Sequence, residues 1–212
     1  MKSAPHFRIS ESCLLWTFGD TLSEQHICQT LGIFQILEKD PEVAELGVTD
    51  LVPAYTSLAV HFQGAETRAE EIIKKVHEKI LSAIPTDDAF GTQHQLPVIY
   101  DGEDLNVIAS HCNLSSEEVI LRHSTPNYLV AMIGFQPNFP YLFGLDEKLA
   151  VPRRETPRIR VPAGAVAIGG TQTGVYPSES PGGWNLIGRT DPARLTALRP
   201  GDRVQFIVRH ES

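Results

Sequence analysis

The residues best suited to chemistry lie in a glycine-rich segment near residue 170. Residues 169–174 read Gly-Gly-Thr-Gln-Thr-Gly, and within them Gln172 and Thr173 supply hydrogen-bond donors and acceptors that suit an amide or a carboxylate. Glycine lets the backbone approach a ligand closely. The segment therefore predicts one wall of a polar pocket, with a tight hairpin that carries polar side chains as the alternative.

Aromatic residues surround this segment in the sequence and would supply the apolar walls of such a pocket. They are Phe135, Phe139, Tyr141, Tyr176 and Trp184. Residues 134–190, which contain all five, hold seven of the fifteen prolines and nine of the sixteen glycines, so loops of restricted backbone shape carry them. Core packing is the alternative role, and we expect at least two of the five to have it.

A basic run stands out in a chain whose formal net charge is −8. Its members are Lys148, Arg153, Arg154, Arg158 and Arg160, with only Glu155 against them. The run favours a carboxylate or phosphate on a small ligand, with a solvated basic ribbon as the alternative. Because the whole chain is acidic, we expect no nucleic-acid partner.

Several kinds of site are missing from the sequence. There is no phosphate loop, nucleophile elbow, zinc-binding H-E-x-x-H helix or dinucleotide turn, which disfavours nucleotide, serine-hydrolase or metalloprotease chemistry by this chain alone. Cys13, Cys28 and Cys112 have the spacing of neither a disulfide framework nor a zinc site, so we expect reduced thiols and no metal. No signal peptide or membrane-length apolar run occurs, which predicts a cytoplasmic protein with no membrane partner.

The elements that would position these residues begin with an alternating pattern. Residues 7–18 are strand-like, and a capping box from Thr21 to Glu24 then predicts a helix that ends near Glu38. Two further strands are predicted at 47–52 and 56–62, followed by an amphipathic helix at 66–82. The order β-α-β-β-α predicts a small ferredoxin-like α+β domain over residues 1–84.

Turn formers and polar residues over 85–95 predict a linker, and residues 96–212 a second domain. A strand at 96–100 precedes two short helices, 104–112 and 116–123, the second opened by the capping box Ser115 to Glu118. The remaining segments are β: 128–133, 165–168 and 203–208. Short strands separated by turns favour a closed or half-closed barrel.

Four ordered blocks then carry a resemblance across essentially the whole chain. They are Gly134-Phe-x-Pro-x-Phe-Pro-Tyr-Leu142, Thr156-Pro-Arg-x-x-Val-Pro-Ala-Gly164, Gln172-Thr-Gly-Val-Tyr-Pro177 and Ser180-Pro-Gly-Gly-Trp-x-Leu-Ile-Gly-Arg-Thr190. They resemble the B subunit of bacterial 5-oxoprolinase, a family also called allophanate hydrolase subunit 1 and Kip-type sporulation-kinase inhibitor. The resemblance implies an α/β N-terminal domain followed by a cyclophilin-like β-barrel.

The resemblance also implies a function. The family acts with a homologous C subunit plus a larger A subunit to open 5-oxoproline to glutamate using ATP, so this chain would need no cofactor of its own. Gln172 and Thr173 would bind the lactam or its carboxylate, Arg158 or Arg189 would pair with negative charge, and aromatic residues would wall the pocket: Phe135, Phe139, Tyr176 and Trp184. No catalytic residue is assigned.

Two other functions occur on the same blocks. One is inhibition of a sensor histidine kinase by docking of the barrel, and the other is carboxyl transfer on a urea-derived substrate. The chain also departs from the family pattern. Asn138 stands where glycine is usual, which a left-handed backbone would tolerate; Thr171 stands where glycine is common; and the segment after Thr190 is shorter than the family's usual arm.

Overall fold

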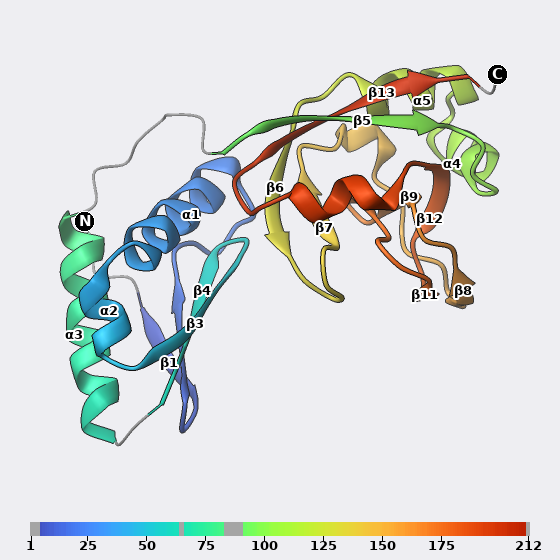
Figure 1. Cartoon of the computed structure of the whole chain (residues 1–212). Coiled ribbons are helices and arrows are strands. Elements are labelled where there is room, and N and C mark those ends of the chain that lie inside the picture. Colours follow the sequence, from blue (N-terminus) through green and yellow to red (C-terminus); the bar gives the residue numbers. More distant parts are fainter. Residues whose placement is uncertain (1–4, 64–65, 83–90, 211–212) are drawn as a thin grey trace. The chain divides into compact units, whose positions relative to one another are not determined.

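The computed structural model describes residues 5–63, 66–82 and 91–210 (Figure 1). The chain forms two compact units, Met1–Phe90 and Gly91–Ser212. Of the predicted linker at 85–95, residues 85–90 lie outside the described residues. Residues 93–95 already belong to the first strand of the second unit, so ordered structure begins earlier than the turn formers indicated.

The first unit is built on one antiparallel sheet. Its strands are β1 (His6–Ser10), β2 (Cys13–Thr17), β3 (Val48–Ala54) and β4 (Ser57–Phe62), in the order β1-β2-β4-β3. The apolar stretch 7–18, predicted as strand, is a hairpin that turns at Glu11 and Ser12. A hairpin turn needs only two residues, so it is easily missed inside an apolar run.

Three helices belong to this unit: α1 (Glu24–Glu38), α2 (Pro41–Glu45) and α3 (Glu66–Ser82). The N-cap of α1 is Ser23, whose side chain accepts a hydrogen bond from the amide of His26, and not Thr21 as the capping-box pattern predicted. Residues from α1 and α3, including Ile33 and Ile72, pack with Trp16 and Leu58 of the sheet in one core. The amphipathic pattern of 66–82 is thus confirmed as a core-covering helix.

The ferredoxin-like prediction is met only in part. Strands β2, β4 and β3 with helix α1 have the relative order expected for the first three strands of that fold. In that fold the other edge strand follows the second helix, whereas here β1 precedes β2 and occupies the edge. The first unit therefore supplies its edge strand from the N-terminal side.

The second unit is a closed barrel, as predicted, with seven strands in the order β10-β7-β6-β13-β5-β12-β9. Their bounds are β5 (Gln93–Ile99), β6 (Tyr128–Ile133), β7 (Pro140–Phe143), β9 (Ala165–Gly169), β10 (Gln172–Val175), β12 (Asn185–Arg189) and β13 (Arg203–Arg209). Alternation decides which side chains fill the interior: Val166 and Ile168 of β9 belong to the interior core, while Ala165 and Ala167 face outward. The sheet that forms the barrel wall therefore packs one core on its inner face and another on its outer face.

Smaller elements cover the barrel. Helices α4 (Leu105–Cys112) and α5 (Ser116–Ser124) contribute Ile108 and Val119 to the interior core, and the predicted capping box of Ser115 and Glu118 is present. A two-stranded sheet pairs β8 (Arg158–Val161) with β11 (Ser180–Gly182). Two 3₁₀ turns complete the unit, η1 (Glu147–Leu149) and η2 (Pro192–Ala197). Among the described helices, none is long and apolar enough to span a membrane.

Candidate functional site

A second, smaller core lies on the outer face of the barrel wall, and it gathers residues from all four sequence blocks. We call four of its rings the outer aromatic cluster: Phe139, Tyr141, Tyr176 and Trp184. The Phe139 ring lies 4.9 Å from that of Tyr141, 5.1 Å from that of Tyr176 and 5.7 Å from that of Trp184, between centroids. The contacts with Tyr176 and Trp184 are edge-to-face, an arrangement that stabilises aromatic pairs beyond the area that they bury.

Glycines in the blocks make room for these rings. A Cβ added at Gly169 would lie 2.7 Å from the indole of Trp184, and one added at Gly182 would lie 2.3 Å from the hydroxyl of Tyr176. Both distances are below any real Cβ contact. Close approach of a ring to a strand therefore explains glycine at these two positions.

Gln172 lies in the same row of the wall as Trp184. Gln172 is the register partner of Gly169 across β9 and β10, and the indole of Trp184 covers the outer face of Gly169. Partners across a ladder point to the same face of a sheet. Gln172 therefore stands on the outer face beside Trp184, although the segment 169–174 is the tight hairpin that was the alternative to a pocket wall.

Arg153 completes this part of the surface. Its guanidinium carbon lies 5.6 Å from the centroid of the Trp184 ring, a cation–π contact. Burial raises the pKa of the Tyr141 hydroxyl, and the charge of Arg153 acts in the opposite direction. An amide, a phenol and a cation thus gather on the outer face around the buried indole of Trp184, and they belong to Gln172, Tyr141 and Arg153.

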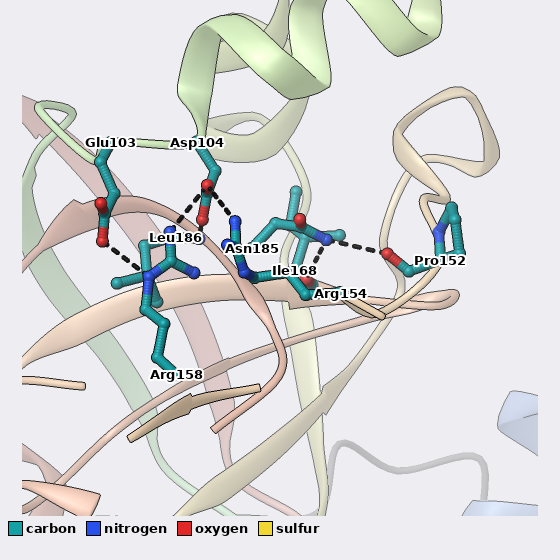
Figure 2. Close-up of polar contacts among 8 residues, drawn as sticks. All are labelled: Glu103, Asp104, Pro152, Arg154, Arg158, Ile168, Asn185 and Leu186. Atoms are coloured by element: carbon teal, nitrogen blue, oxygen red, sulfur yellow. Dashed lines mark hydrogen bonds and ion pairs between the residues drawn. The ribbon is translucent and has the colours of Figure 1, made fainter. Parts of the chain in front are cut away.

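A buried carboxylate, Asp104, organises the neighbouring polar network (Figure 2). Its Oδ1 accepts hydrogen bonds from Arg158 Nη2 at 2.8 Å and Arg154 Nη1 at 3.1 Å, and its Oδ2 accepts one from the Leu186 amide at 2.7 Å. Asp104 precedes α4 but makes no side-chain cap, because both oxygens are engaged elsewhere. The carboxylate ties β8 and β12 to the start of α4.

Arg158, predicted to pair with a ligand's negative charge, is instead part of this network. Its Nε also contacts Glu103 Oε1 at 2.7 Å, and 14% of its side chain is exposed. Nearby, Asn185 Nδ2 donates to the carbonyls of Pro152 and Ile168 at 3.0 and 3.3 Å, which fastens the loop that carries Arg153 to the barrel wall (Figure 2). The side chains of Arg158 and Asn185 therefore hold in place the segments that carry the outer surface.

Thr173 was predicted to contact substrate but lies in the barrel interior, with no exposed surface. Its hydroxyl donates to the Ala167 carbonyl at 2.9 Å and lies 2.8 Å from His123 Nε2. Strand alternation explains the difference, because neighbouring residues on β10 point to opposite faces. Gln172 faces outward and Thr173 therefore faces inward.

The other predicted residues fall into three places. Phe139, Tyr176 and Trp184 are nearly fully buried in the outer aromatic cluster, as core packing predicted for at least two of the five aromatics. Phe135 is 64% exposed, and its ring lies 5.5 Å from Phe139. Arg189 ends β12, at the opposite end of that strand from Trp184. The arginine is therefore separate from the aromatic surface.

Two residues of the first block have a left-handed backbone, and one of them is Asn138, for which that geometry was the condition of tolerance. Asn138 has a φ of 65°, so asparagine at the usual glycine position is tolerated, and Phe135 has a φ of 70°. A positive φ is costly for a phenylalanine, and such outliers concentrate at binding sites. The turn thus holds an exposed ring at the edge of the outer aromatic cluster.

Sequence reasoning missed two residues as contributors to the site, Asp104 and Asn185, and it did not single out Arg153. The basic run that contains Arg153 was a signal for it, but the run did not distinguish Arg153 from Arg158. In the sequence, Asp104 marks only the start of a helix. Its long-range partners had no local signal.

The family model for the carboxyltransferase domain, subdomain C and D, matches residues 6–197. Three curated relatives are named as the B subunit of 5-oxoprolinase. The protein of Escherichia coli O157:H7 is 43% identical over a match that covers 77% of this chain and 79% of the relative. The protein of Haemophilus influenzae is 40% identical, and the match covers 94% of this chain and 95% of the relative. The protein of Bacillus subtilis is 35% identical, and the match covers 94% of this chain and 90% of the relative.

Two solved structures place the fold in larger chains. The crystal structure of TTHA0988 is 38% identical with a TM-score of 0.77, covering 94% of this chain and 40% of that one. The chain thus spans less than half the length of TTHA0988. The urea amidolyase of Kluyveromyces lactis is 17% identical with a TM-score of 0.74, covering 96% of this chain and 14% of that one, a likeness of fold alone.

Proposed function

This chain belongs to the B-subunit family of 5-oxoprolinase, and we propose that it forms, with the A and C subunits of that enzyme, the site that opens 5-oxo-L-proline to L-glutamate using ATP. The observation that carries the proposal is the 35–43% identity to three proteins of that name over most of the chain. The sequence contains no phosphate loop. The chain is therefore a non-autonomous subunit of an ATP-hydrolysing amidohydrolase.

The surface around Gln172 suits such a substrate. 5-Oxoproline is a small lactam ring with one carboxylate, so it needs a partner for the amide, a cation and an apolar wall. Gln172 has both a donor and an acceptor for the lactam group, and the Arg153 guanidinium pairs with the carboxylate. Tyr141 supplies the wall, and the buried ring of Trp184 packs against it.

This surface lies on the outside of the barrel, so another protein has to enclose it. Composite sites exclude water only when a second polypeptide lies over them, and stable interfaces commonly bury about 1,200–2,000 Å² in total. The fold also occurs within longer chains, of which it makes up 40% in TTHA0988 and 14% in the Kluyveromyces lactis urea amidolyase. The C subunit is the partner that we propose for this face.

Reconstitution tests the proposal. The purified chain is incubated with ATP and 5-oxoproline alone, with the C subunit, and with both the A and C subunits, while glutamate formation is measured. We expect glutamate only when all three proteins are present, and co-elution of this chain with the C subunit in size-exclusion chromatography. ATP-dependent glutamate formation by the chain alone would exclude the shared site. Separate elution at micromolar concentration would instead favour the histidine-kinase inhibitor.

A further inference from the structure

A groove with a volume of about 480 Å³ lies on the barrel at the end of β12 away from Trp184. Three arginines from separate segments line it: Arg189 ends β12, Arg194 lies in η2, and Arg209 ends β13. At about 3.3 Å per residue, the five-residue strand places Arg189 roughly 17 Å along the strand from Trp184. We call this the arginine groove, and it is distinct from the outer aromatic cluster.

The barrel register brings two of these arginines together. Ile99 of β5 is the partner of Arg189 on one side and of Arg209 on the other. Side chains in such a row point to one face of the sheet. The side chains of Arg189 and Arg209 therefore flank Ile99 on the same face of the sheet. Pro97 and Ala163 add to the apolar surface of the groove.

The charges in the groove are unbalanced. Arg189 Nε contacts Asp101 Oδ2 at 2.6 Å, but no carboxylate of the described residues forms an ion pair with Arg194 or Arg209. Asp191, which also lines the groove, accepts a hydrogen bond from the Ala193 amide through Oδ1. A local excess of positive charge is unexpected in a chain with a formal net charge of −8.

We propose that the arginine groove binds a small anion whose oxyanion head, a carboxylate or a phosphate, contacts Arg194 and Arg209 and whose apolar body lies on Ile99. Guanidinium groups donate paired hydrogen bonds to both kinds of oxyanion. The volume is within the range of about 300–1,000 Å³ usual for small-molecule sites. This site is independent of the proposed 5-oxoproline site and does not rest on it.

Calorimetric titration of the purified chain tests the groove with two probes, phenyl phosphate and benzoate. They share a ring and differ in the head group. The variant Arg194→Gln/Arg209→Gln removes both charges from exposed positions, so thermal unfolding should stay close to that of the parent chain. Arg160→Gln is the matched control, because Arg160 is an exposed arginine on β8 that pairs with Glu179 outside the groove.

We expect at least one probe to bind with a dissociation constant below about 1 mM at low salt, and added NaCl to weaken it. The double variant should bind about tenfold more weakly or worse, while Arg160→Gln binds like the parent. Binding of phenyl phosphate alone assigns a phosphate head, and equal binding of both probes assigns any oxyanion. Absence of saturation by either probe at about 10 mM, or unchanged affinity in the folded double variant, overturns the proposal.

Discussion

His123 Nε2 and Thr173 Oγ1 lie 2.8 Å apart inside the closed barrel, and the pair fixes the protonation of the imidazole. The Thr173 hydroxyl donates its only hydrogen to the Ala167 carbonyl, so it accepts one from Nε2. Nδ1 then accepts from the hydroxyl of Tyr100, 2.8 Å away. Each hydrogen bond is satisfied only while His123 is neutral.

The first prediction follows from this burial, which lowers the pKa of His123 from 6.5 to about 3. The unfolded chain binds the proton below pH 6.5 and the folded chain does not, so stability falls as the pH drops from 6.5 towards 3. At pH 4.5 this one group should cost about 2–3 kcal/mol of unfolding free energy relative to pH 7. His123→Gln should remove that part of the pH dependence.

Urea unfolding at the two pH values measures the effect, with a Trp16→Phe background so that Trp184 fluorescence reports on the barrel. His111→Gln is the control, since it makes the same substitution at an exposed histidine on α4. An equal loss of stability at pH 4.5 in the parent and in His123→Gln would contradict a buried neutral imidazole.

Asp104→Ala should be among the most destabilising changes in the barrel. Removal of a carboxylate that is 3% exposed leaves the Leu186 amide and Arg158 Nη2 without their acceptor, although Arg158 Nε keeps its contact with Glu103, and breaking such a buried pair costs about 3–5 kcal/mol. Glu179→Ala breaks the exposed Arg160 pair and should cost about 1 kcal/mol or less. Chemical denaturation compares the two variants, and equal midpoints would show that the network does not support the fold.

Gln172→Ala should separate activity from stability. The side chain stands at the partly exposed start of β10, so its loss should change stability by only about 0.5 kcal/mol. Turnover of the reconstituted complex should fall roughly ten- to a hundredfold, the loss of about 1.4–2.8 kcal/mol of transition-state stabilisation. Thr171→Ala, in the adjoining exposed turn, should keep full turnover. Wild-type turnover in Gln172→Ala would show that residues 169–174 form a hairpin with no role in the site.

Trp184 should matter to both the activity of the complex and the stability of the chain. Trp184→Ala removes a side chain that is 5% exposed and should cost about 3–5 kcal/mol of stability as well as activity. Gly169→Ala should displace the ring without removing it, and so shift the Trp184 fluorescence to longer wavelength. Gly183→Ala is its control, because a Cβ there would meet its nearest atom at 3.7 Å. A Gly169→Ala variant with unchanged emission and activity would refute the close seating of the indole.

Much of the fold follows from local patterns. The helix at 66–82 and the capping box at Ser115 were predictable because periodicity and caps are encoded within a few residues. The hairpin inside 7–18 and the position of β1 at the sheet edge were not, since strand order depends on pairing between distant segments. Closure of a barrel was predictable, whereas its register was not.

The candidate site was predictable in composition but not in arrangement. The blocks identified Gln172 and Trp184, which the register does bring into one row. They also grouped Thr173 and Arg189 with them, although alternation on β10 turns Thr173 inward and the length of β12 carries Arg189 to a different groove. Which face a strand residue takes is fixed by register, and no single block encodes it.

Because β5 pairs in parallel with β13, the barrel strand that is synthesised first depends on the strand that is synthesised last. Residues 93–99 emerge from the ribosome first among the barrel strands, and their partners, residues 203–209, emerge last. Until then β5 exposes an unpaired edge that carries Leu96 and Val98, which makes the nascent unit a target for chaperones and for misassociation. The first unit, whose described strands and helices are all translated earlier, has no such wait.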